Sequence, residues 1–266
     1  LRRSISKLGY DSNFTIYDTD DSQRLMKSCI ADADVSEKQF PPRAVLTEIS
    51  LAKDRMCSPE YFCIEAGSDY RKMVIGKLYK EYQNRLKSAN ALDFDDLIYK
   101  TVELLESFPE ELEYYQNRFR YIMVDEYQDT NHAQFRLVQL LSQKHQNLCV
   151  VGDDDQSIYR FRGATIENIL NFEKQFQNAV VIRLEQNYRS TKTILEAAND
   201  VIAHNAGRKE KTLWTDLEDG KKIIWYKAVD ETDESRFVAE KIEKEVQNGA
   251  SYQDFAVLYR MNAQSN

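Results

Sequence analysis

The sequence predicts an α/β protein, in which a largely helical region precedes short parallel strands that alternate with helices. The chain has only 8 glycines and 4 prolines in 266 residues, which favours helices joined by short connections. Apolar residues recur at helical spacing through the first 115 or so residues, and short apolar runs separated by helical patterns follow. Such alternation is typical of a parallel sheet that helices cover on both faces.

The helical region contains two clear amphipathic patterns. Residues 70–87 and residues 94–108 each place their apolar side chains along one helical stripe, which predicts helices that pack into a core. Residues 36–58 include a Pro-Pro pair and predict shorter helices.

Three short apolar runs, at residues 121–124, 148–151 and 180–184, predict strands. Residues 133–142 and 165–176 carry the helical patterns between them. Polar clusters follow the first two runs. Because ligands bind beyond the carboxyl ends of parallel strands, these clusters are the candidate site.

The last part of the chain predicts two further helices and two further strands. A long helix is expected to begin at Ser190, and a second helix over residues 231–248 is expected to end at Gly249. Residues 222–229 and 254–260 predict the strands.

Composition excludes several classes of protein. The 36 basic and 44 acidic residues leave a net charge of −8, which argues against a protein that coats nucleic acid by bulk charge. No apolar run approaches the ~18 residues of a membrane-spanning helix. The four cysteines form no Cys-x-x-Cys pair and the three histidines are scattered, so we expect neither a zinc site nor disulfides, and a reducing cytoplasm.

Asp125 and Glu126 are adjacent carboxylates at the end of the first predicted strand. One can hold a divalent cation while the other orients or deprotonates a water, as in Mg²⁺-dependent nucleotide hydrolysis. The alternative is a solvated strand end with a helix cap.

A glycine and three aspartates, followed by Gln156, end the next strand. Glycine permits a sharp turn, and the Gln156 amide can donate and accept hydrogen bonds, so it can sense a phosphate oxygen. The three aspartates fit neither an EF-hand nor a dispersed two-metal site, which disfavours a metal cluster.

Tyr159 and Phe161 alternate with two arginines. In an extended segment both rings would share one face, forming a platform on which bases stack while arginine meets phosphate. An edge strand with buried rings is the alternative. Further along, Tyr188 could stack on adenine and Arg189 could reach a γ-phosphate, although these residues alone favour an ordinary loop with an ion pair.

Taken together and in order, residues 124–130, 152–164 and 184–191 resemble the Walker B motif, motif III and motif IV of superfamily 1 DNA helicases of the PcrA/UvrD/Rep group. Residues 91–98 and 256–265 resemble two further motifs of that group. The resemblance extends through essentially the whole chain.

This resemblance implies partial RecA-like lobes of the P-loop NTPase class with a helical insertion domain. Residues 1–115 would be the insertion, residues 116–185 the later part of the first lobe, and residues 186–266 the start of the second.

The resemblance also implies an ATP-driven motor that moves 3′ to 5′ on single-stranded DNA and unwinds duplex at single-strand/duplex junctions. Asp125 would hold Mg²⁺ and Glu126 would activate the attacking water. Gln156 would contact the γ-phosphate, Tyr188 would stack on the adenine, and Arg189 would act as an arginine finger. DNA repair or replication is the pathway that the family suggests.

The same resemblance assigns a set of DNA contacts. The group usually has tryptophan at the position of Phe161, whose ring offers a smaller stacking face. The residues expected to contact DNA are Phe94, Tyr159, Phe161, Arg162, Arg260 and Asn262.

Several parts of the motor pattern do not occur in these 266 residues. There is no Gly-x-x-x-x-Gly-Lys-Thr/Ser loop, no preceding adenine motif, and no motif V or VI. Leu1 is not an initiator methionine, so we expect a piece of a longer helicase that hydrolyses no ATP by itself. The alternatives are a lobe of a RecB/AddA-like helicase–nuclease, a non-motor single-strand-binding module, and a small Mg²⁺-dependent phosphohydrolase.

Overall fold

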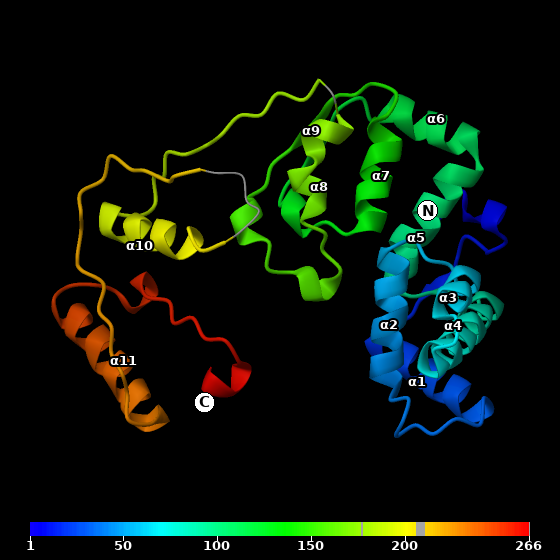
Figure 1. Cartoon of the computed structure of the whole chain (residues 1–266), viewed down its shortest axis with the longest axis horizontal. Coiled ribbons are helices and arrows are strands. Elements are labelled where there is room, and N and C mark those ends of the chain that lie inside the picture. Colours follow the sequence, from blue (N-terminus) through cyan, green and yellow to red (C-terminus); the bar gives the residue numbers. More distant parts are fainter. Residues whose placement is uncertain (177, 206–210, 266) are drawn as a thin grey trace. The chain divides into compact units, whose positions relative to one another are not determined.

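The computed structural model describes residues 1–176, 178–205 and 211–265, which divide into two compact units (Figure 1). The first unit comprises Leu1–Leu184 and Ile202–Lys211, and the second comprises Glu185–Val201 and Thr212–Asn266. In this described part of the chain, every helix is too short or too polar to cross a lipid bilayer.

The N-terminal part of the first unit is helical, as the sequence predicts. The expected helices at 70–87 and 94–108 are confirmed. The helices of this region are α1 (Thr19–Asp32), α2 (Pro42–Asp54), α3 (Pro59–Ala66), α4 (Tyr70–Ser88), α5 (Phe94–Ser107) and α6 (Pro109–Arg118), with a 3-10 turn η1 (Ile5–Leu8) before them.

Local chemistry explains where these helices begin. Side-chain oxygens of Asp18, Ser58, Asp69 and Asp93 accept hydrogen bonds from backbone N–H groups in the first turns of α1, α3, α4 and α5. Their apolar faces meet in a core with less than 3% exposure at its centre. Central members of that core are Met26, Ile30, Val45, Ile49, Ile75, Leu78, Tyr79, Tyr82 and Leu86.

Two parallel strand pairs are present in the first unit. Strand β1 (Thr15–Ile16) pairs with β2 (Ala91–Leu92), which directly precedes α5. Strand β3 (Ile122–Val124) pairs with β4 (Leu148–Val150), and α7 (His132–Ser142) lies between them in sequence. The second pair confirms the predicted parallel strands and the helix that connects them.

The expectation that helices cover both faces of this sheet is wrong for the described residues. Met123 is 79% exposed and Cys149 is also exposed, whereas their neighbours in each strand are half-buried. Side chains alternate across a strand, and the packing that buries one face here leaves the other open.

Three predicted strands, at residues 180–184, 222–229 and 254–260, are wrong because these segments have no strand partner in the described residues. A strand exists only through hydrogen bonds to a neighbour, which an apolar run cannot supply by itself. Within the described part of the second unit, a single isolated parallel bridge joins Gln186 and Trp214.

The remaining helices differ from the predictions mainly at their ends. The helix expected at 165–176 is split into α8 (Glu167–Leu170) and α9 (Phe172–Gln175), and α10 (Lys192–Ile202) begins two residues after Ser190. Helix α11 (Glu231–Gln247) is confirmed, and Gly249 follows it at φ 103°. The short 3-10 turns are η2 (Tyr127–Asp129), η3 (Asp154–Gln156), η4 (Arg160–Arg162), η5 (Tyr252–Asp254) and η6 (Asn262–Ser265).

Candidate functional site

Asp125 and Glu126 directly follow strand β3, and both are exposed. The backbone N–H of Glu126 donates to Asp125 Oδ1 at 2.9 Å, and Glu126 adopts the left-handed conformation at φ 49°. This sharp change of direction ends the strand. Among the described residues no hydrogen bond or ion pair is found at the second oxygen of Asp125, and an exposed carboxylate oxygen suits a hard cation such as Mg²⁺.

A buried glutamine connects Glu126 to the loop after β4. Gln128 is 1% exposed; its Nε2 donates to Glu126 Oε2 at 2.8 Å, and its Oε1 accepts the Asp153 N–H at 2.9 Å. Sequence reasoning missed this residue, because a glutamine in a polar cluster gives no sign of being buried. The bond from Gln128 Nε2 orients the Glu126 carboxylate, and the bond from the Asp153 N–H fixes the Gln128 amide.

Gln156 extends this hydrogen-bonded network. It lies exposed at the end of η3, and its Nε2 donates to Asp153 Oδ2 at 2.8 Å. A continuous chain of hydrogen bonds therefore runs from Glu126 through Gln128 and Asp153 to Gln156. Glu126 and Gln156, which the sequence analysis assigned to one site, are thus connected by hydrogen bonds.

Gly152 permits this close approach, and we expect Gly152→Ala to disrupt it. A Cβ at this position would stand 2.6 Å from Gln128 Oε1 and 2.9 Å from Ile169 Cδ1. Overpacking of this kind costs about 1–3 kcal/mol of folding free energy. Chemical denaturation of the variant measures that loss. Gly152 is not at a positive φ, so the loss reports the steric collision and not backbone strain. A Gly152→Ala chain as stable as the parent would contradict the close packing.

The three aspartates of this loop share a lysine counter-ion. Lys211 Nζ contacts the Asp153 carboxylate and lies 3.6 Å from Asp154 Oδ1 and 3.4 Å from Asp155 Oδ2. Burial raises the pKa of Asp153, but its hydrogen bonds from Lys211 and Gln156 outweigh burial and hold it below the ordinary value. The ammonium group stands where a metal ion would have to bind.

The aromatic pair after this loop is not extended. Residues Arg160–Arg162 form the 3-10 turn η4, so the expected strand-like alternation of rings and guanidinium groups is wrong. The rings of Tyr159 and Phe161 nevertheless lie together, with centroids 6.0 Å apart and planes at 49°. The tight 3-10 turn, and not an extended strand, brings these two rings close together. The side chain of Arg162 is outside the described part.

Phe161 and Phe94 line one groove of about 670 Å³, although they are far apart in the sequence. Phe161 is 68% exposed and Phe94 is 60% exposed. Most of the remaining wall comes from α1, α2 and the start of α5, and Tyr82 of α4 and Asn131 before α7 complete it. Exposed rings beside a groove suit stacking on nucleic-acid bases.

A buried ion cluster fixes the start of α5, where Phe94 lies. Lys53 Nζ is 2.6 Å from Asp93 Oδ2 and 2.9 Å from Asp96 Oδ1, and all three side chains are almost fully buried. Burial lowers the pKa of Lys53, but the Asp96 and Asp93 carboxylates outweigh it and hold that pKa above its ordinary value. These buried ion pairs fix the first turn of α5 and therefore the backbone position of Phe94.

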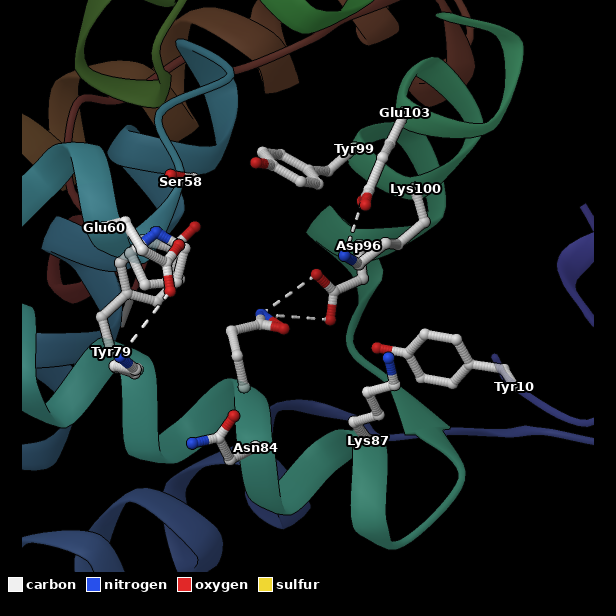
Figure 2. A pocket seen from close by; sticks show the side chains of 13 residues that line it. Tyr10, Ser58, Glu60, Tyr79, Asn84, Lys87, Asp96, Tyr99, Lys100 and Glu103 are labelled. Atoms are coloured by element: carbon white, nitrogen blue, oxygen red, sulfur yellow. Dashed lines mark hydrogen bonds and ion pairs between the residues drawn. The ribbon is translucent and has the colours of Figure 1, made fainter. Parts of the chain in front are cut away.

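On its other side, Asp96 borders a cavity of about 220 Å³ between α3, α4 and α5 (Figure 2). Figure 2 shows the Asp96 carboxylate directed toward α4, where the Gln83 amide donates to it at 3.1 Å. Lys100 and Glu103 form an ion pair at 2.6 Å along the same rim. The charged side chains named here on the cavity wall are thus engaged with one another or with Gln83.

Tyr188 and Arg189 belong to the second unit and are exposed. The Tyr188 hydroxyl donates to Gln186 Oε1 at 2.8 Å, and the N–H groups of Arg189 and Ser190 donate to Asn187 Oδ1. This side-chain turn, and not a helix cap at Ser190, presents the two predicted nucleotide contacts.

Arg260 and Asn262 lie near the end of the second unit. Arg260 is exposed and its N–H donates to Gln264 Oε1 at 3.0 Å, and Asn262 begins η6. Their predicted contact with DNA stays a prediction.

The comparisons with known proteins agree with the motifs. The UvrD/REP helicase N-terminal domain family matches residues 1–177, and the UvrD-like helicase C-terminal domain family matches residues 182–266. ATP-dependent DNA helicase PcrA of Staphylococcus aureus (strain Mu50) is 52% identical over 265 residues, and PcrA of Staphylococcus epidermidis is 50% identical. The match covers 100% of this chain but 36% of each relative.

The likeness to PcrA that the motifs predict is confirmed, as is the α/β class with a partial RecA-like fold. Because the two family matches cover nearly every residue, the chain belongs to the UvrD/REP family of DNA helicases.

Proposed function

We propose that these residues form part of an ATP-dependent helicase that moves 3′ to 5′ on single-stranded DNA and acts at single-strand/duplex junctions. The observation that carries this proposal is the hydrogen-bonded chain from Glu126 to Gln156, which ends a few residues before the Tyr159/Phe161 pair. A nucleotide-sensing group and an aromatic platform are thereby joined through one short loop.

We propose the following roles for the nucleotide site. Asp125 binds Mg²⁺ through its second carboxylate oxygen, and Glu126, oriented by Gln128, accepts a proton from the attacking water. Gln156 senses the γ-phosphate; for Tyr188 and Arg189 the roles of adenine stacking and arginine finger rest on the motif. Bound Mg²⁺–ATP supplies the phosphoryl group and the charge that this site must neutralise.

The three-part organisation at 1–115, 116–185 and 186–266 is part of the same proposal. The fragment contains no phosphate-binding loop with its lysine, so we propose that it hydrolyses no ATP by itself. All four cysteines are free, which is compatible with the proposed cytoplasmic location.

Phe161→Ala is expected to weaken binding of this chain to a labelled oligo(dT) by about 5- to 150-fold, because one stacked base contributes about 1–3 kcal/mol. Phe161→Trp should bind more tightly than the parent chain, since indole offers a larger stacking face. Fluorescence anisotropy measures both affinities. Tyr61→Ala removes another exposed ring, 55% exposed on α3 and outside the groove, and serves as the control.

An unchanged affinity of Phe161→Ala, or an equal loss in Tyr61→Ala, would contradict the aromatic platform. The helicase–nuclease alternative needs a nuclease domain outside these residues. The phosphohydrolase alternative requires turnover of nucleotide by this chain without DNA.

A further inference from the structure

Asp54, the last residue of α2, contacts two segments that are far from it in sequence. Its Oδ1 accepts a hydrogen bond from Asn131 Nδ2 at 2.5 Å, and Asn131 is the N-cap of α7. Its Oδ2 packs against Gly163, the residue that closes the η4 turn, where a Cβ would collide with the carboxylate. One side chain thus holds the segment after Asp125–Glu126 and the turn that carries Phe161.

This carboxylate is unfavourable for folding at neutral pH. Burial, and then the charge of Asp95 on α5, raise the pKa of Asp54 to about 6. Its sequence neighbour Lys53 is engaged by Asp93 and Asp96, and within the described residues Asp54 forms no ion pair. The negative charge on Asp54 therefore lowers the folding stability. The contacts of its carboxylate with Asn131 and Gly163 order the two segments to which those residues belong.

Asp54 lines the same groove as Asn131, Phe94 and Phe161. The Gly163 turn has φ +82°, and its N–H donates to Arg160 O at 3.1 Å, so its position determines how η4 presents Phe161. Movement of this turn away from α2 would carry Phe161 out of the groove wall.

We propose that Asp54 is a positioning residue for single-strand binding. Its carboxylate holds the Gly163 turn against the Asn131 cap and so keeps Phe161 in the groove that Phe94 also lines. This inference rests on the proposed DNA-binding function, and it adds a residue from α2 that none of the helicase motifs quoted above contains.

The first test combines amide hydrogen exchange with oligo(dT) affinity for the 266-residue chain. Asp54→Ala is expected to speed exchange in residues 157–165 at least fivefold and to weaken binding at least fivefold. Asp54→Asn keeps an acceptor for Asn131 without the charge, so it should bind within twofold of the parent and melt at a higher temperature at pH 8. Glu48→Ala, an exposed carboxylate on the same helix α2 and outside the groove lining, is the matched control and should leave both exchange in residues 157–165 and oligo(dT) affinity unchanged.

A double-mutant cycle provides the second test. Gly163→Ala should weaken DNA binding strongly where Asp54 is present, and at least threefold less in the Asp54→Ala background, because the collision is then relieved. Equal losses in both backgrounds, or an Asp54→Ala chain whose exchange and affinity match the parent, would overturn the proposal. If the parent chain binds no oligo(dT) while Asp54→Ala still speeds exchange, the proposed DNA-binding function fails and the holding role of Asp54 stands.

Discussion

Glu126→Gln is expected to lower DNA-stimulated ATP hydrolysis by about 10²- to 10⁴-fold in a full-length helicase that contains these residues, which is the usual effect of losing a general base. The substituted amide can still accept the Gln128 hydrogen bond through its oxygen, so the local geometry should persist. Steady-state phosphate release with saturating oligo(dT) measures the rate.

ATP affinity separates this chemical role from a structural one. It should change by less than a few-fold in Glu126→Gln, because the carboxylate acts on the attacking water. Glu231→Gln, in the first turn of α11, is the matched control and should keep the parent rate. A Glu126→Gln enzyme with full turnover would remove Glu126 from the chemistry, and turnover by the isolated 266-residue chain would favour the phosphohydrolase alternative.

Lys53→Met should produce the largest loss of folding free energy, about 3–5 kcal/mol, because it leaves two buried carboxylates without their cation. Methionine has a similar length and fills the same space, so lost charge compensation dominates the effect. Denaturant unfolding at pH 7.5 measures the loss. Lys27→Met, at an exposed ion pair with Glu37 of 3.7 Å, is the control and should cost less than about 1 kcal/mol.

The pH dependence of Lys53→Met has a defined sign. In the parent chain burial raises the pKa of Asp93, but the Lys53 charge and the hydrogen bonds to the carboxylate hold it below its ordinary value. Burial and the Asp93 charge already raise the pKa of Asp96 to about 6 with Lys53 present. Without Lys53, burial and mutual repulsion raise the pKa of both carboxylates further, above those of the unfolded chain. A raised acid pKa makes folding more favourable as the pH falls, so part of the lost stability should return between pH 8 and pH 5. A loss that does not shrink at acid pH would contradict this charge account.

Local patterns were sufficient for much of the fold. The sequence determined α4, α5, α7 and α11, because helical spacing and capping residues act within a few positions of one another. The parallel pair of β3 and β4 was also predictable, because two apolar runs flank a helix. The same reasoning placed Asp125, Glu126 and Gln156 at strand ends.

Tertiary structure alone decided the remaining features. The runs at 180–184, 222–229 and 254–260 lack a strand partner in the described residues, which no local pattern can reveal. The burial of Gln128, the shared groove of Phe94 and Phe161, and the contacts of Asp54 depend on segments that are distant in sequence. Residue type and spacing therefore determined which groups carry the chemistry. Packing between distant segments decided which groups meet, because hydrogen bonds and burial depend on proximity in space.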